Sequence, residues 1–301
     1  MTELALRGLD GANPLGFLTA LGALRTATLV WPQAGPKLAW VLKSGTWRPT
    51  ILGVPDAGIF VSALAELLST GSSEAFALSR KFPYQAHALR KQAVNAQQTT
   101  YPARRTLADF IVAYGCEALV DKDGNFADTA LRMLRSADSG GSGMLAYASV
   151  LAEITTAEDI DRTLFYAWRY LDDPPSMRWD PVDDRRYALR WSNPSSDKIT
   201  TLRGANRLAI EALPLLPTMP MHGRLETTAF TQRKGKGVFW TWPIWAVPAT
   251  LDIVRSLLSL SGLQQEKPNR RQLNAVGVTE IYRCQRITQG KYRNFTPARP
   301  V

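Results

Sequence analysis

A turn followed by one long apolar segment near the amino end constrains the fold more than any other stretch of this chain. The turn is Asp10-Gly11-Ala12-Asn13-Pro14, which places Pro14 in the first turn of a helix and Asn13 at its N-cap. Over residues 15–30, leucines recur at helical spacing with small residues between them. Such a helix has little polar surface, so we expect it to pack closely on its neighbours.

Shorter patterns along the chain predict mixed α and β structure. Strands are expected at residues 4–9, 38–42, 187–191, 225–230 and 238–242. Helices are expected at residues 56–68, 107–119, 126–134, 144–154, 157–170 and 203–213, and a solvated helix at 85–96 is the alternative to a nucleic-acid-binding segment there. The predicted fold class is therefore α+β, with mixed helices, short antiparallel sheets, a helical acidic middle region and a basic C-terminal half.

Charge is distributed in blocks along the 301 residues, which are enough for one large or two modest domains. Residues 178–301 hold 20 Lys and Arg against 9 Asp and Glu. Residues 80–105 carry 6 basic residues and no acid, whereas 106–177 carry 5 basic and 12 acidic residues. We therefore place a domain boundary between a mixed α/β region at 1–177 and a basic region at 178–301. Basic blocks favour a polyanionic partner, and we expect the acidic helices to dock on a protein.

The first basic block mixes cations with planar and amide side chains, a composition that suits nucleic acid. Cations contact phosphates, and rings such as Phe82, Tyr84 and Tyr101 can stack on unpaired bases. The alternative is a solvated basic helix with ordinary surface loops. The nucleic-acid-binding candidates here are Arg80, Lys81, Arg90, Lys91, Arg104 and Arg105.

The second basic block divides into four pieces: a strand within 183–191, a helix start at 203–207, a loop at 232–237 and a tail at 283–299. We expect the loop to join two strands, and tails of this composition are often disordered until bound. The phosphate-binding candidates are Arg185, Arg186, Arg190, Arg203, Arg207, Lys234, Lys236, Arg283, Arg286, Lys291 and Arg293. Asn206 and Asn294 are candidates for contacts to base edges.

Catalytic signatures are scarce in this sequence. It has only two histidines, no phosphate-binding loop of the Walker type and no G-x-G-x-x-G motif, so we expect no enzyme activity, cofactor or metal. One alternative is a metal-dependent nuclease using Asp180, Asp183 and Asp184, although Arg185 and Arg186 explain the acidic pair by local ion pairing. Another alternative is a basic scaffold that binds an acidic protein.

Localisation is expected to be cytoplasmic. Two cysteines, Cys116 and Cys284, are too few for a disulfide framework and indicate a reducing compartment. The amino end has no basic stretch followed by an apolar run, and no stretch reaches the 18 apolar residues typical of a membrane span. Neither secretion nor membrane association is expected.

Several stretches resemble proteins of type I-G (formerly I-U) CRISPR loci. They are 9–11 (LDG), 14–25 (PLGFLTALGALR), 178–181 (RWDP), 184–191 (DRRYALRW), 204–209 (GANRLA), 286–288 (RIT) and 290–295 (GKYRNF). The resemblance implies a non-catalytic, large-subunit-like component of a crRNA-guided surveillance complex that contacts target DNA near its adjacent motif. The partners implied are crRNA, target DNA, other effector subunits and a recruited helicase-nuclease. Protein in such complexes holds backbone and displaced strand while base pairing reads the sequence.

Overall fold

A long buried helix lies in the middle of the molecule. The computed structural model describes residues 2–71, 73–79, 81–98, 105–134, 143–184, 200–289 and 292–301. In it, α1 (Pro14–Val30) is buried from Pro14 to Ala27, and the Asn13 side chain accepts a 3.0 Å hydrogen bond from the Gly16 amide. The predicted turn, N-cap and close packing are all confirmed.

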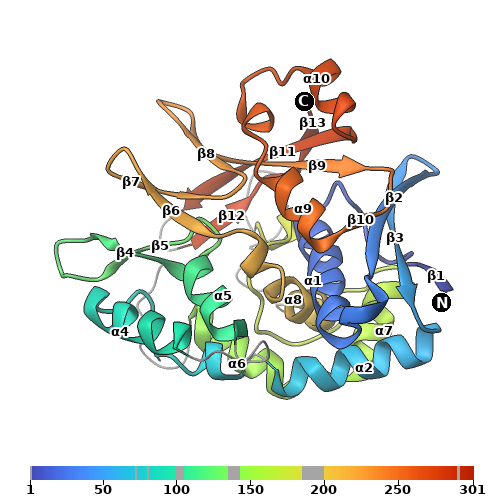
Figure 1. Ribbon diagram of the computed structural model, residues 1–301, viewed down its shortest axis with the longest axis horizontal. Coiled ribbons are helices and arrows are strands. Elements are labelled where there is room, and N and C mark those ends of the chain that lie inside the picture. Colours follow the sequence, from blue (N-terminus) through green and yellow to red (C-terminus); the bar gives the residue numbers. More distant parts are fainter. Residues whose placement is uncertain are drawn as a thin grey trace, which may run out of the picture.

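The close packing of α1 depends on one glycine. α8 (Arg203–Ile210) lies beside α1 (Figure 1). A Cβ on Gly22 would lie 1.8 Å from the Leu208 carbonyl oxygen, so no larger residue fits there without separating the helices. Thr19 adds a contact, because its hydroxyl donates to the Ala205 carbonyl at 3.2 Å.

Antiparallel sheets surround this helix pair. One has the order β1-β3-β2-β10, with β1 (Thr2–Ala5), β3 (Thr46–Val54), β2 (Lys37–Lys43) and β10 (Ala249–Thr250). The other has the order β12-β11-β9-β8, with β12 (Tyr292–Phe295), β11 (Val278–Gln289), β9 (Gly237–Trp245) and β8 (Phe230–Arg233), and β13 (Arg299–Pro300) also pairs with β11. Two hairpins complete the set: β4 (Gly115–Val120) with β5 (Phe126–Asp128), and β6 (Thr218–Met221) with β7 (Arg224–Thr227).

Helices cover the side of the molecule away from the larger sheet (Figure 1). The remaining α-helices are α2 (Ala57–Thr70), α3 (Ser73–Phe76), α4 (Ala86–Gln97), α5 (Arg105–Tyr114), α6 (Met144–Ile154), α7 (Ala157–Phe165), α9 (Leu251–Leu258) and α10 (Arg270–Ala275). Short 3-10 turns are η1 (Pro32–Ala34), η3 (Pro181–Asp183), η5 (Leu213–Leu215) and η6 (Ser261–Gln264). The α+β fold class is confirmed.

One hydrophobic core spans both predicted domains. The Phe17 ring on α1 lies 5.6 Å from the rings of Trp40 on β2 and of Trp242 on β9. The Trp242 indole donates to the Gly11 carbonyl at 2.9 Å, and the Trp245 indole donates to the Leu38 carbonyl at 2.7 Å. The boundary at 177/178 thus separates two charge regions but not two cores.

Tertiary pairing overrides the helices expected at 107–119 and 126–134. The first helix ends at Tyr114, and the chain continues as β4; Phe126 begins β5 instead of a helix. Gly115 permits this pairing, since a Cβ there would lie 2.3 Å from the Ala127 carbonyl oxygen. The Asp121 carboxylate accepts hydrogen bonds across the hairpin turn, including one from the Asn125 amide at 2.9 Å. Packing and ladder hydrogen bonds therefore outweigh local helix propensity here.

The structure corrects two further predictions, the length of the helix at 157–170 and disorder in the C-terminal tail, and does not test a third. The helix at 157–170 is shorter, since α7 ends at Phe165. The tail is not disordered over the residues that the structure describes, because β11, β12 and β13 belong to a sheet and bury Cys284 and Phe295. The strand at 187–191 lies outside the described residues.

Candidate nucleic-acid interface

Six of the predicted nucleic-acid contacts lie outside the described residues: Arg80, Arg104, Arg185, Arg186, Arg190 and Lys291. Arg105 begins α5, and only its backbone is described. The other candidates fall into two groups, one exposed and one built into the fold.

The first basic block keeps its cations on the surface and buries its rings. Lys81, Arg90 and Lys91 are exposed, and Arg90 lies 3.7 Å from the Glu117 carboxylate. Phe82 and Tyr84 are buried, and burial raises the pKa of Tyr84 to about 12. These two rings therefore cannot stack on bases as the sequence suggests, and Tyr101 lies outside the described residues.

Asn206 is a structural residue, so the prediction of a base-edge contact is wrong. Its side chain is 1% exposed. The Oδ1 atom accepts from the Met177 amide at 2.8 Å, while Nδ2 donates to Thr201 and to the Leu202 carbonyl. All of its hydrogen-bonding groups are used inside the protein.

Arg207 is likewise wrong as a phosphate contact. It is fully buried, and its guanidinium donates to the Leu68 carbonyl at 2.7 Å and to Glu211 at 2.9 Å. Arg25 of α1 reaches the other Glu211 oxygen at 2.5 Å. Burial lowers the pKa of Arg207, while the charge of Glu211 acts in the opposite direction. We call Arg25, Arg207 and Glu211 the buried charge cluster; it ties α1 to α8.

Arg283 is the third contradicted candidate. Its guanidinium donates to Thr241 and to the carbonyls of Leu263, Gln265 and Glu266. These hydrogen bonds stabilise the end of η6 and the segment after it. Burial lowers the pKa of this guanidinium to about 10. Arg203 is only partly enclosed, with its Nη1 atom 3.5 Å from Asp159.

Three further candidates, Arg286, Arg293 and Asn294, lie where β11 and β12 contact segments distant in the sequence. Asn294 is buried and accepts a 2.5 Å hydrogen bond from Arg178, so the prediction that it reads a base edge is wrong. Arg286 donates to the Ala130 carbonyl at 2.7 Å, and Arg293 donates to the Arg132 carbonyl at 3.1 Å. Burial, with a smaller contribution from the nearby Arg293 charge, lowers the pKa of Arg286 to about 10. These arginines hold the 130–132 segment against β11 and β12.

The aspartates of the nuclease alternative also have structural partners. Asp180 is buried; its carboxylate accepts from Asn13 at 3.2 Å and from the Tyr170 hydroxyl at 3.0 Å. Burial raises the pKa of Asp180. The Asp183 carboxylate accepts from Ser176 at 2.8 Å. Within the described ranges, no group of three or more His, Cys, Asp or Glu side chains is placed to hold a metal ion.

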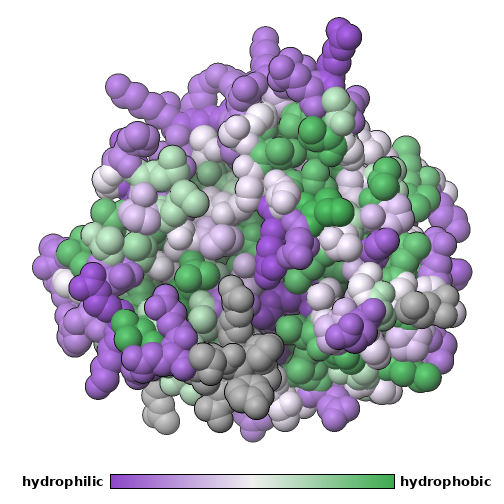
Figure 2. Space-filling view, in the orientation of Figure 1, coloured by the Kyte–Doolittle hydropathy of each residue, from purple (hydrophilic) through white to green (hydrophobic). Residues whose placement is uncertain are grey.

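Two neighbouring hairpins bring exposed cations together among the described residues. In β6–β7 a two-residue turn, His222-Gly223, has φ values of 50° and 73°, typical of a tight type I′ hairpin. In β8–β9 the three residues Lys234, Gly235 and Lys236 form the turn, which confirms the predicted hairpin loop. Both hairpin ends lie at the upper left of Figure 1, and Figure 2 shows hydrophilic side chains projecting there.

A cleft of about 660 Å³ opens between these hairpin ends, and we call it the hairpin cleft. It is lined by Arg224, Gln232, Lys234 and Gly235. Neither Arg224 nor Lys234 makes a side-chain hydrogen bond or ion pair with any described residue. Arg224 was not among the predicted contacts, although the His222-Gly223 pair predicts a hairpin with Arg224 beside the turn.

The other two cations of this loop are engaged within the protein. Lys236 lies 2.7 Å from the Glu266 carboxylate, in an exposed ion pair. The Arg233 guanidinium lies over the Phe239 ring, 5.0 Å from its centre. Charge available to a ligand is thus concentrated at Arg224 and Lys234.

A scan of the chain against protein-family models found no match, and a search of curated proteins found none either. Among the described residues, no helix combines the length and the apolar character that crossing a bilayer requires.

Proposed function

We propose that this protein is a non-catalytic, nucleic-acid-binding subunit of a crRNA-guided type I CRISPR surveillance complex in antiviral defence. The hairpin cleft is the observation that supports it best. Arg224 and Lys234 face one open cleft. Among the described residues, neither cation has a side-chain partner and no acidic residue lines the cleft. The stretches that resemble type I-G proteins support the assignment to this class of complex.

The cleft has the chemistry needed to hold a phosphate backbone. Lys and Arg neutralise phosphates and release condensed counterions, which makes binding depend on salt. Gln232 adds an amide that can form hydrogen bonds with sugar or base atoms. Gly235 has no side chain, so a nucleic-acid strand can approach the backbone of the turn closely. Lys81 and Lys91 supply a second, purely electrostatic contact area.

This role requires no catalytic residue in the chain. Base pairing between crRNA and target DNA supplies the sequence recognition, and a recruited helicase-nuclease supplies cleavage. The acidic helical region docks on other effector subunits in the cytoplasm. The hydrogen bonds from Asn13 to Asp180 and from Arg178 to Asn294 then serve as structural support in or beside the resembling stretches.

Filter-binding titrations of the full chain against single-stranded RNA, single-stranded DNA and duplex DNA test the proposal. We expect affinity to fall steeply as salt rises from about 50 to about 200 mM. Arg224→Ala and Lys234→Ala should each lower the slope of log affinity against log salt by about one. Affinity that is independent of salt, or no binding even with the other effector subunits present, would contradict the proposal.

Matched controls come from cations elsewhere on the surface. Lys43 is an exposed lysine at the end of the β2–β3 hairpin, and Arg271 is an exposed arginine in α10. Lys43→Ala and Arg271→Ala remove the same charge outside the cleft, so the slope should stay close to that of the unmodified protein. Equal losses in all four variants would indicate general charge attraction without a defined site.

A further inference from the structure

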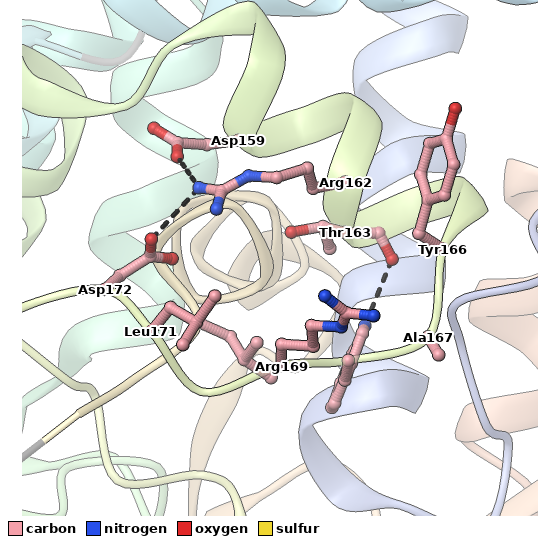
Figure 3. A pocket seen from close by; sticks show the side chains of 10 residues that line it. Asp159, Arg162, Thr163, Tyr166, Ala167, Arg169, Leu171 and Asp172 are labelled. Atoms are coloured by element: carbon pink, nitrogen blue, oxygen red, sulfur yellow. Dashed lines mark hydrogen bonds and ion pairs between the residues drawn. The ribbon is translucent and has the colours of Figure 1, made fainter.

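A second pocket lies where the chain turns back after α7. It has a volume of about 450 Å³ and is lined by the end of the helix, the returning segment 166–172 and Leu202. Figure 3 shows Arg162, Tyr166, Arg169 and Leu171 arranged around the open space. We call this space the α7 pocket.

One wall of the α7 pocket is held by an ion-pair network. The Arg162 guanidinium lies 2.5 Å from the Asp159 carboxylate and 3.0 Å from that of Asp172. Asp172 also accepts a 2.8 Å hydrogen bond from the Arg203 amide at the start of α8. These carboxylates are occupied by internal donors, so the wall is fixed and its acidic charge is compensated.

The opposite wall is aromatic. The Trp168 indole donates to the Thr163 carbonyl at 3.1 Å, which fixes the orientation of the ring. Tyr166 is 61% exposed and Leu171 is 63% exposed, although both line the pocket. Large apolar surfaces left open in a concave site are typical of small-molecule binding sites.

Arg169 gives the pocket its free positive charge. Its side chain is exposed and makes no hydrogen bond or ion pair with any described residue. Arg162, in contrast, is paired with two carboxylates. A ligand that matches this arrangement has a flat, weakly polar part for the aromatic wall and an anionic group for Arg169.

We propose that the α7 pocket binds a nucleotide, with the base against Tyr166 and Trp168 and the phosphate at Arg169. Base–aromatic stacking and a guanidinium–phosphate contact are the two interactions that these side chains supply. The volume lies within the range of about 300–1,000 Å³ found for small-molecule sites. The site is independent of the hairpin cleft, because α7 and the two hairpins lie at opposite sides of the molecule (Figure 1).

A base joined to a phosphate can come from two sources, a free mononucleotide or one residue of a single strand. Isothermal titration calorimetry of the full chain with AMP, GMP, CMP and UMP tests the first source. Single-stranded RNA and DNA heptamers, titrated into the Arg224→Ala/Lys234→Ala variant so that the hairpin cleft does not contribute, test the second. If mononucleotides bind, the natural ligand of the α7 pocket is a free nucleotide. If only heptamers bind, the ligand is one residue of a single strand.

Three variants test the assignment to this pocket. Tyr166→Ala should weaken the affinity about tenfold, whereas Tyr166→Phe should preserve it, since stacking needs only the ring. Arg169→Ala should weaken binding of AMP several-fold and leave binding of adenosine unchanged, because only AMP carries the phosphate. Circular dichroism verifies that each variant is folded, which is expected because both residues are exposed.

Controls separate this site from the hairpin cleft. Arg271→Ala removes a distant arginine and should not change the affinity for mononucleotides or heptamers. The Arg224→Ala/Lys234→Ala double variant disables the hairpin cleft and should leave the affinity for mononucleotides unchanged. The proposal is overturned if neither mononucleotides nor heptamers bind. It is equally overturned if their affinity is unchanged in both Tyr166→Ala and Arg169→Ala.

Discussion

Arg207 in α8 and Lys234 in the β8–β9 turn belong to the same basic block of sequence, yet the fold uses them in opposite ways. Arg207 is fully buried and bonded to Glu211 and to the Leu68 carbonyl. Lys234 lines an open cleft and has no partner among the described residues. The comparison teaches that the net charge of this block overstates the charge available to a polyanion, because part of it stabilises the interior.

The largest effect on stability is expected for the buried charge cluster that contains Arg207. Glu211→Gln removes the carboxylate paired with Arg207 and leaves Arg25 with only Asp109, 4.0 Å away, which should cost about 3–5 kcal/mol of unfolding free energy. Urea denaturation followed by circular dichroism measures it. Glu266→Gln is the control, since that carboxylate is exposed and its removal should leave the midpoint almost unchanged. Equal midpoints for both variants would show that the cluster is not structural.

The next effect concerns the helix contact that encloses this cluster. Gly22→Ala places a Cβ 1.8 Å from the Leu208 carbonyl oxygen and forces α1 and α8 apart, at a cost of about 1–3 kcal/mol. Gly58→Ala in α2 is the matched control, because the nearest atom to its Cβ is a side-chain oxygen 3.4 Å away. The same denaturation measurement should show unchanged or slightly higher stability for the control. Loss of stability in Gly58→Ala alone would contradict this account of the helix contact.

Asp159 is a buried carboxylate beside the α7 pocket, with a smaller expected effect than the buried charge cluster. Burial acts to raise its pKa, but hydrogen bonds from Thr156 and Arg162 outweigh burial and hold the pKa below the ordinary value of 3.8. Its ionised form therefore adds stability above the unfolded-state value, and this contribution is lost as pH falls through the folded-state value. The stability difference between the unmodified protein and Asp159→Asn should shrink as pH is lowered from 7 toward that range, which urea titrations at several pH values measure. A difference independent of pH would contradict it.

The smallest expected effect on stability tests the exposed side. The Arg224→Ala/Lys234→Ala double variant should change the unfolding free energy by no more than about 0.5 kcal/mol, because neither side chain has a partner in the part of the chain that the structure describes. Thermal denaturation measures this in the same samples used for the salt titrations. A marked loss of stability would show that Arg224 and Lys234 are structural cations like Arg207. It would contradict their proposed role in binding a ligand at the hairpin cleft.

Local patterns predicted the parts of the fold that short-range physics controls. The N-cap at Asn13, the helix that follows it and the turn at Lys234–Lys236 all follow from side-chain hydrogen bonding, helical spacing or glycine placement within a few residues. Of the candidate site, the exposed Lys81, Arg90, Lys91, Lys234 and Lys236 remain on the surface as predicted. The prediction of a helix at 126–134 is wrong, because the residues at its start, Phe126–Asp128, form β5 and pair with β4.

The sequence by itself determined the buried helix, the α+β class and the excess of positive charge in residues 178–301. Only the tertiary structure decided which cations are free. Arg207 reaches a carbonyl 139 positions away, and Arg286 reaches one 156 positions away. An arginine carries the same charge in either setting, and whether a buried carbonyl or a phosphate accepts its hydrogen bonds depends on contacts between distant segments that no local pattern encodes.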